Sequence, residues 1–393
     1  MDSLSRRSLM RACAVTTLTL GSSNATARAA ARTTARTAGP HRAALRPPVD
    51  TAALRAAIGD LSHPPATSAQ LLVECRSTHW YGTAGAADLT SGRDVRPDDG
   101  FRAGSITKSL VATLVLRLWA QDRIDLDAPI GRYLPGLRLP PTFGRITATQ
   151  LLNHTSGLPD HQGLPDLGTP EAVLQHRFDR WTPQQWVRTV TGSPLKFAPG
   201  TCQEYRGINY VLLALLLEKM TGRRYGDAIA DRILRPLGLT RTLFPGDDPR
   251  LHGPHVHGYL RLTDGSLRDA TVYNPSSSWG EGELVSTSAD LFRFQQALFS
   301  GALLSPKAMD KLFTLPPATV RMLDGSPARY SMGLQTATVN GVTFWGKTGE
   351  NYGYRTRMFA TRDLTTRFLL SYTPTPLNTA EDMTNRVVTV LTA

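Results

Sequence analysis

One stretch of the chain, residues 101–116, places a glycine, a serine and a lysine directly before a long apolar run. After Lys108 the residues are nearly all apolar, with only small hydroxyl side chains between them. This pattern predicts a helix that is buried on most of its circumference rather than along one stripe. Gly104 breaks the chain just before it, so we expect Ser105 at the helix start, where backbone N–H groups are unpaired. The fold must therefore enclose this helix.

Ser105 and Lys108 are three residues apart, so on a helix they lie one turn apart on the same face. An amine that an apolar helix holds beside a hydroxyl can lose its proton and act as a base, because burial disfavours the charged form. A serine next to such a base is an activated nucleophile. The simpler alternative is a serine cap followed by an ordinary lysine, and this stretch alone favours that alternative.

The net charge of +12 is concentrated at the start of the chain. Residues 1–48 hold eight arginines and one acidic residue, so they contribute +7 and leave +5 for the other 345 residues. A basic patch that binds nucleic acid would have to lie within the folded part of the chain, where the excess of positive charge is small. We therefore expect no nucleic-acid partner.

The first 29 residues have the pattern of an export signal. Ser5-Arg6-Arg7-Ser8-Leu9-Met10 is a twin-arginine motif, and a weakly apolar run and small-residue triplets follow it. We interpret residues 1–29 as a twin-arginine signal and residues 30–50 as a flexible linker. The alternative is a disordered tail on a cytosolic enzyme. No other stretch approaches the ~20 uncharged apolar residues that span a bilayer, so we expect no stable membrane anchor.

Cysteines and histidines give no sign of a metal or other cofactor. Cys75 and Cys202 are the two cysteines after the leader. They could form one disulfide or remain two free thiols, and the sequence does not decide between these alternatives. His252, His255 and His257 crowd a loop with glycine and proline, which is more typical of a solvated loop than of a ligand set.

Strand patterns lie at both ends of the chain and helix patterns in the middle. Together they predict a sheet built from residues 51–119 and 282–393, with a mainly helical region, 120–281, inserted between. The predicted elements are a helix over 51–61, a hairpin of strands 70–80 and 83–89 with Gly82 between them, helices over 149–154, 183–191, 208–220 and 288–299, strands 330–339, 342–345, 354–361 and 367–373, and a closing helix over 378–391.

Three motifs occur in a specific order: Ser105-Ile106-Thr107-Lys108, then Tyr205, then Lys347-Thr348-Gly349. This order resembles the penicillin-recognising serine enzymes. In detail the chain is similar to the class C β-lactamase and serine DD-carboxypeptidase branch, which also contains esterases and transacylases. Supporting stretches are residues 151–159, 236–239 and 282–291. A second S-x-x-K, Ser193 to Lys196, contains a proline and lies in a loop pattern, so we do not expect it to be catalytic.

The resemblance implies an α/β (α+β) fold of the β-lactamase type with an antiparallel sheet, and an enzyme that acts through a covalent acyl-enzyme. Ser105 would attack a carbonyl, and Lys108 and Tyr205 would share the proton transfers. The backbone N–H groups of Ser105 and Glu350 would form an oxyanion hole.

It also implies a set of substrate-binding residues. Lys347 and Thr348 would hold a carboxylate or an equivalent polar group. Gly349 would let the substrate lie close against its strand, because it has no side chain. Trp279 could line the cleft, although a tryptophan packed under its loop is the more probable alternative.

The chain departs from this pattern twice. The usual Tyr-x-Asn is here Tyr205-Arg206-Gly207, so the amide that holds the substrate's own amide group is missing, a loss of ~1–3 kcal/mol. Glu350 follows Lys347-Thr348-Gly349 and would place a carboxylate near the oxyanion strand, where it could repel a carboxylate or receive an amine.

We therefore predict a serine hydrolase that cleaves an amide or ester bond in a small-molecule or peptide acyl substrate. One alternative is a transacylase that passes the acyl group to an amine in secondary-metabolite or peptide tailoring. An export signal favours the hydrolase, and a leader without function favours the transferase. Another alternative is a non-catalytic penicillin-binding sensor, but binding alone needs none of the chemistry of Ser105, Lys108 and Tyr205. The sequence predicts no oligomeric state.

Overall fold

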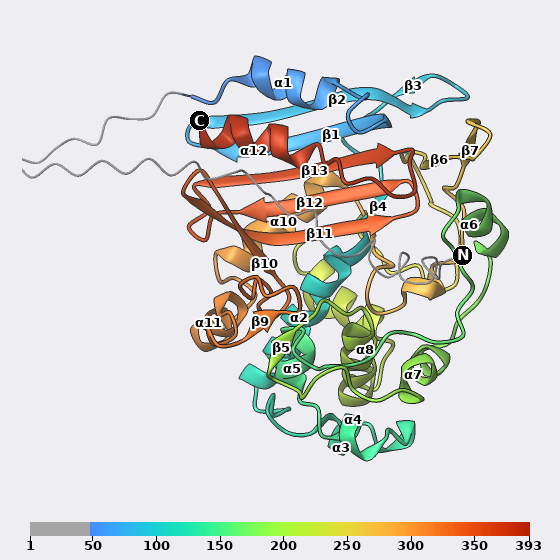
Figure 1. Ribbon diagram of the computed structural model, residues 1–393. Helices are drawn as coiled ribbons and strands as arrows, with labels where there is room; N and C mark the ends of the chain where they lie inside the picture. Colours follow the sequence, from blue (N-terminus) through green and yellow to red (C-terminus); the bar gives the residue numbers. More distant parts are fainter. Residues whose placement is uncertain (1–47) are drawn as a thin grey trace, which may run out of the picture.

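The computed structural model describes residues 48–393, so the predicted leader and nearly all of the predicted linker lie outside the described residues. A seven-stranded antiparallel sheet forms the upper part of the molecule in Figure 1, and helices from the middle of the chain form the lower part. Across the sheet the strands are β10 (Gln335–Val339), β11 (Val342–Asn351), β12 (Tyr354–Ala360), β13 (Thr366–Pro374), β1 (Ala66–Cys75), β2 (Thr78–Asp88) and β3 (Arg93–Asp94).

The two ends of the chain meet in the middle of this sheet. Strand β1 pairs with β13 in antiparallel register, with Leu71 opposite Leu370. The predicted sheet built from both termini is therefore confirmed.

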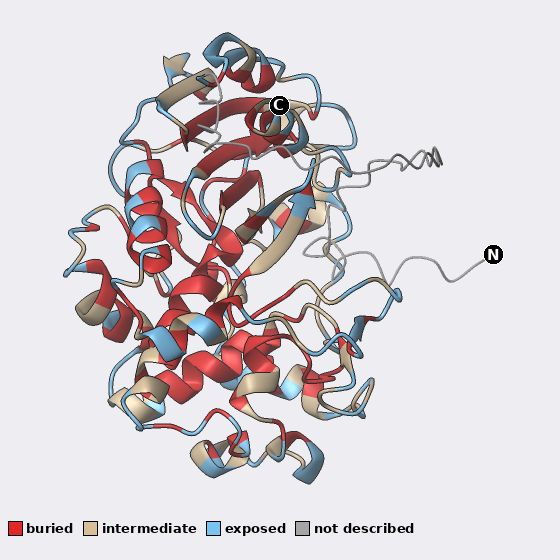
Figure 2. Ribbon diagram, turned by 90° about the vertical axis from the view of Figure 1, so that its left-hand side faces the viewer, coloured by how far each residue is buried: buried red, intermediate tan, exposed pale blue. Residues whose placement is uncertain are grey.

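Helices cover both faces of the central strands. α1 (Thr51–Gly59) and α12 (Thr384–Thr392) pack on one face, where Leu71 and Val73 join their hydrophobic core. α10 (Ser288–Phe299) packs on the other face, where Leu72 belongs to the second core. Strand β1 is consequently buried along nearly its whole length, as Figure 2 shows in red for the central strands.

The long apolar helix predicted after Ser105 is α2 (Thr107–Ala120), and its first ten residues are all buried. It lies between the sheet and the helical region, with α8 (Ile208–Thr221) and α11 (Pro306–Phe313) packed against it (Figure 1). The predicted burial on most of the circumference is confirmed. The other helices are α3 (Ile130–Tyr133), α4 (Pro141–Gly144), α5 (Ala148–Leu152), α6 (Pro170–His176), α7 (Pro183–Thr191) and α9 (Tyr225–Ile229), and the short strands are β4 (Phe101–Arg102), β5 (Cys202–Gln203), β6 (Tyr259–Arg261), β7 (Leu267–Asp269), β8 (Val285–Ser286) and β9 (Arg321–Met322).

Three predicted boundaries are wrong. The hairpin turns after Cys75, where Arg76 has φ +57, and not at Gly82. Gly82 lies inside β2. A glycine suits this strand position because the ring of Trp80 fills the space that a side chain at position 82 would need. Strand β11 runs on to Asn351, and the closing helix begins only at Thr384.

The remaining sequence predictions concern cysteines, metals and membranes. Cys75 and Cys202 are both free thiols. Among residues 48–393 no group of three or more histidine, cysteine or acidic side chains could hold a metal ion. No helix in this part of the chain is long and apolar enough to cross a membrane.

Candidate active site

Ser105 lies in a short 3-10 turn, η1 (Gly104–Ile106), that leads directly into α2. The Nζ atom of Lys108 is 3.0 Å from Ser105 Oγ, and the lysine side chain is fully buried. The same Nζ lies 2.8 Å from the backbone carbonyl of Glu281 and 3.0 Å from its Oε2. These three acceptors match the three donors of an ammonium group, so Lys108 is fixed beside the serine hydroxyl.

Tyr205 lies between the two lysines of the site. Lys108 Nζ is 5.1 Å from the centre of its ring and Lys347 Nζ is 4.5 Å from it. Cations at these distances are attracted to an aromatic ring. The structure thus brings together all three motifs of the sequence, the S-x-x-K, the tyrosine and the K-T-G.

The ring of Tyr205 packs between His154 and Tyr330, with centroid distances of 4.5 and 5.2 Å. Burial lowers the pKa of His154 well below its usual value, and the charges of Lys108 and Lys347 lower it further. Its Nδ1 accepts a hydrogen bond of 3.1 Å from the backbone N–H of Arg206. His154 is therefore neutral, and it supports Tyr205 by packing.

The backbone of η1 lies close against β11. A Cβ at Gly349 would lie 1.9 Å from the carbonyl oxygen of Ala103 and 3.2 Å from Ser105 N, and one at Gly104 would lie 2.5 Å from Glu350 N. Only glycine fits at both positions. The space beside Gly349 is thus filled by the chain itself, whereas the sequence suggested that substrate would lie there. This contact sets the backbone N–H groups of Ser105 and Glu350 on neighbouring segments.

Glu350 is held by a buried ion pair. Its Oε1 lies 3.0 Å from Arg357 Nη2, and Arg357 also contacts Asp382 at 2.5 Å. Burial opposes the charge on Arg357, but the charges of Asp382, Tyr372 and Glu350 together outweigh burial and raise the arginine pKa. Burial alone would raise the pKa of Asp382, and Arg357 together with hydrogen bonds from Thr384 brings it down to about 2. Arg355 Nε lies 3.8 Å from the same Glu350 oxygen, so two arginines face the two carboxylates, and Glu350 is a poor receptor for an amine.

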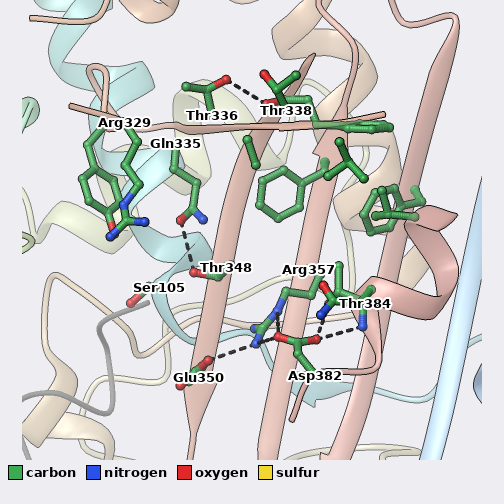
Figure 3. Close-up of a pocket in the computed structure, with 18 of the residues that line it drawn as sticks. Ser105, Arg329, Gln335, Thr336, Thr338, Thr348, Glu350, Arg357, Asp382 and Thr384 are labelled. Atoms are coloured by element: carbon green, nitrogen blue, oxygen red, sulfur yellow. Dashed lines mark hydrogen bonds and ion pairs between the residues drawn. The ribbon is translucent and has the colours of Figure 1, made fainter. Parts of the chain in front are cut away.

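A pocket of about 210 Å³ opens at Ser105. Figure 3 shows Thr348 and Gln335 near its serine end and Glu350, Arg357 and Asp382 along one wall. Lys347 and Thr348 both hydrogen-bond Gln335, at 3.3 and 3.2 Å. The far end is apolar and is lined by Val339, Phe344, Phe359, Phe368 and Val388.

Trp279 is not among the residues that line this pocket. Its ring stands edge-on to Tyr225, with centroids 4.9 Å apart, and packs beside Phe244 and the buried Glu283. Trp279 is therefore packed under its loop, as the alternative interpretation of the sequence describes. A substrate-binding role for Trp279 stays a prediction.

Two residues of the site have no signal that sequence reasoning could use. Glu281 lies in a glycine-rich loop between two helices, and only the fold places its carboxylate on Lys108. Gln335 is the first residue of β10, and the pairing of β10 with β11 brings it to Lys347. The first contact joins segments 173 positions apart, and the second depends on the register of a hairpin.

Fold and site together define a serine hydrolase of the type whose nucleophile is paired with a lysine and a tyrosine. The family model described as Beta-lactamase matches residues 67–392, so the chain belongs to that family. The resemblance seen in the motifs and the predicted fold class are thereby confirmed.

Known relatives agree with this assignment. The D-stereospecific amidohydrolase from Streptomyces sp. has a similar structure, with a TM-score of 0.75 and 33% identity over 86% of this chain and 97% of that one. The D-aminopeptidase of Cereibacter sphaeroides is 30% identical over 284 residues, 71% of this chain and 51% of that protein. The esterase EstB of Burkholderia gladioli is 34% identical over 194 residues, 46% of this chain and 48% of that protein. The chain spans about half the length of these curated relatives.

Proposed function

We propose that this protein is a serine hydrolase that cleaves an amide or ester bond through an acyl-enzyme formed on Ser105. The observation that carries the proposal is the 3.0 Å contact between Lys108 Nζ and Ser105 Oγ, made by a fully buried lysine. A purely structural lysine gains little from burial beside a hydroxyl, because removing its charge from water is costly.

The reaction follows from the arrangement of the side chains. Ser105 Oγ bonds to the carbonyl carbon of the substrate, and its proton passes to the phenolate oxygen of Tyr205, while the Lys108 ammonium stabilises the negative charge that develops on Oγ. The backbone N–H groups of Ser105 and Glu350 stabilise the negative charge on the carbonyl oxygen. The proton then passes to the leaving amine or alcohol as the bond to it breaks. Water attacks the resulting ester in the second step and regenerates Ser105.

Names of relatives guide the choice of substrate. A D-stereospecific amidohydrolase and a D-aminopeptidase are both similar to this chain over most of its length. We propose that the acyl donor is derived from a D-amino acid, either as a small amide or ester or at the end of a peptide. The pocket beside Ser105 offers polar groups near the serine and an apolar end for a side chain or leaving group.

Labelling with a fluorescent fluorophosphonate tests the nucleophile. Wild-type protein should be labelled, and Ser105→Ala should not. Ser193→Ala is a matched control, because Ser193 begins the second S-x-x-K of the chain and should stay dispensable. Loss of label in Ser193→Ala, or retention of label in Ser105→Ala, would refute the assignment. Addition of amines during turnover, followed by mass spectrometry of the products, separates a hydrolase from a transacylase.

A further inference from the structure

A side chain at position 207 would compete with Glu281 for space, although the backbone conformation of Gly207 suits any residue. Gly207 precedes α8 with φ −64 and ψ −43, angles that every L-residue adopts readily. A Cβ at this position, however, would lie 1.7 Å from Glu281 Oε2 and 2.3 Å from Glu281 Cδ. The carboxylate of Glu281 therefore occupies the volume in which a side chain at position 207 would stand.

Glu281 reaches this volume from the loop between Trp279 and Glu283 and has one oxygen to spare. Its Oε2 contacts Lys108, but within residues 48–393 its Oε1 accepts no hydrogen bond. The side chain is 20% exposed, and Lys108 Nζ lies 3.0 Å from both its Oε2 and Ser105 Oγ, so a solvent-accessible carboxylate stands one ammonium group away from the nucleophile. The spare oxygen is a hydrogen-bond acceptor beside the nucleophile.

The charges around the nucleophile also matter. Lys108 and Lys347 place two ammonium groups next to Tyr205. Burial lowers the pKa of the neighbouring His161 to about 4, so this histidine adds no charge at neutral pH. Glu350 is engaged by Arg357. Glu281 is thus the carboxylate that offsets one of the two lysine charges, and without it the cluster would repel a cationic substrate more strongly.

An ionised carboxylate only accepts hydrogen bonds, whereas an asparagine amide at position 207 would donate one to a substrate carbonyl. We propose that Glu281 determines specificity at the acyl side of the cleft. It favours acyl donors with a free ammonium group next to the scissile carbonyl over donors whose amine is acylated. This inference rests on the proposed function and names the substrate class of the same site. A charge-assisted hydrogen bond of this kind corresponds to a preference of about 10- to 100-fold.

The test is protection of Ser105 from the fluorophosphonate by two matched ligands, D-phenylalanine amide and N-acetyl-D-phenylalanine amide. Wild-type protein should be protected at least about tenfold better by the free amine. Glu281→Gln keeps the size of the side chain but replaces one acceptor with a donor, so the ratio should fall to about one or below. Glu74→Gln is the matched control, and its ratio should stay at the wild-type value because Glu74 is paired with Arg367 and does not line the pocket.

A second variant covers the possibility that Glu281→Gln simply alters Lys108. In Gly207→Asn/Glu281→Ala the new side chain enters the space that the carboxylate leaves, and the ratio should invert in favour of the acetylated ligand. Equal protection of the wild type by both ligands, including no protection by either, would overturn the inference, as would an unchanged ratio in Glu281→Gln. In those outcomes Ser105 is still labelled and the proposed function stands. Absence of label in the wild type would overturn both.

Discussion

The substitution Gly349→Ala tests how closely β11 must approach the nucleophile. The added methyl carbon would lie 1.9 Å from the carbonyl oxygen of Ala103, whereas ordinary contacts begin at 3.4 Å. The strand and the η1 turn must therefore separate by about 1.5 Å at this point. Neither partner can avoid the clash by a side-chain rotation, because the oxygen belongs to the backbone.

That separation moves the N–H of Glu350 relative to that of Ser105. Oxyanion donors act at about 2.7–3.1 Å, so a displacement of this size removes one of them, and the expected loss in kcat is about 10²- to 10³-fold. Overpacking should cost about 1–3 kcal/mol of stability, which an ordinary domain tolerates.

The assay compares kcat for a chromogenic ester with the melting temperature. Gly192→Ala is the matched control, because its Cβ meets nothing within 4 Å and its φ is −82, and it should leave kcat unchanged. A Gly349→Ala enzyme with kcat within about threefold of the wild type would refute the proposed oxyanion hole.

Three further results are expected. Burial raises the pKa of Glu283 to about 7 from its usual 4.5, so the folded state binds this proton more tightly than the unfolded state does. The free energy of unfolding should therefore fall by up to about 3 kcal/mol as the pH rises from about 4.5 to 7. Glu283→Gln should remove that part of the slope in urea unfolding, and an identical slope would contradict it. Asp382→Asn leaves the buried charge of Arg357 poorly paired and should lower the free energy of unfolding by about 3–5 kcal/mol. A loss below about 1 kcal/mol would show that Glu350 alone is enough to compensate the charge of Arg357. If residues 1–29 are an export signal, replacement of Arg6 and Arg7 by lysine should stop export of a reporter fused to them, and unchanged export would exclude the twin-arginine route.

Local patterns were enough to predict the core of the site. The apolar run after Lys108 predicts the buried helix α2, and the spacing of Ser105 and Lys108 sets them on one face. The strand that carries Lys347 is also visible in the sequence, although its end is not, because Gly346 and Gly349 interrupt the pattern inside the strand before the turn at Gly353.

Contacts between distant segments decide the rest. Glu350 looks like a free acid in the sequence, yet Arg357 on the neighbouring strand pairs with it, and Asp382 before α12 binds the same arginine. Gly207 looks like the loss of a binding group, yet Glu281, 74 positions later, fills its place. Neither pairing has a local signal, because the first depends on the register of β11 and β12 and the second on how the loop that carries Glu281 folds back on the start of α8.

The central claim is the covalent acyl-enzyme on Ser105, and rapid-quench mass spectrometry measures it directly. Mixing the protein with a 4-nitrophenyl ester should give a burst of nitrophenolate equal to the enzyme concentration. The intact protein should gain the mass of the acyl group minus one hydrogen, located on the peptide that contains Ser105. Turnover of the ester with no burst and no adduct at any quench time, or an adduct that persists in Ser105→Ala, would contradict the account.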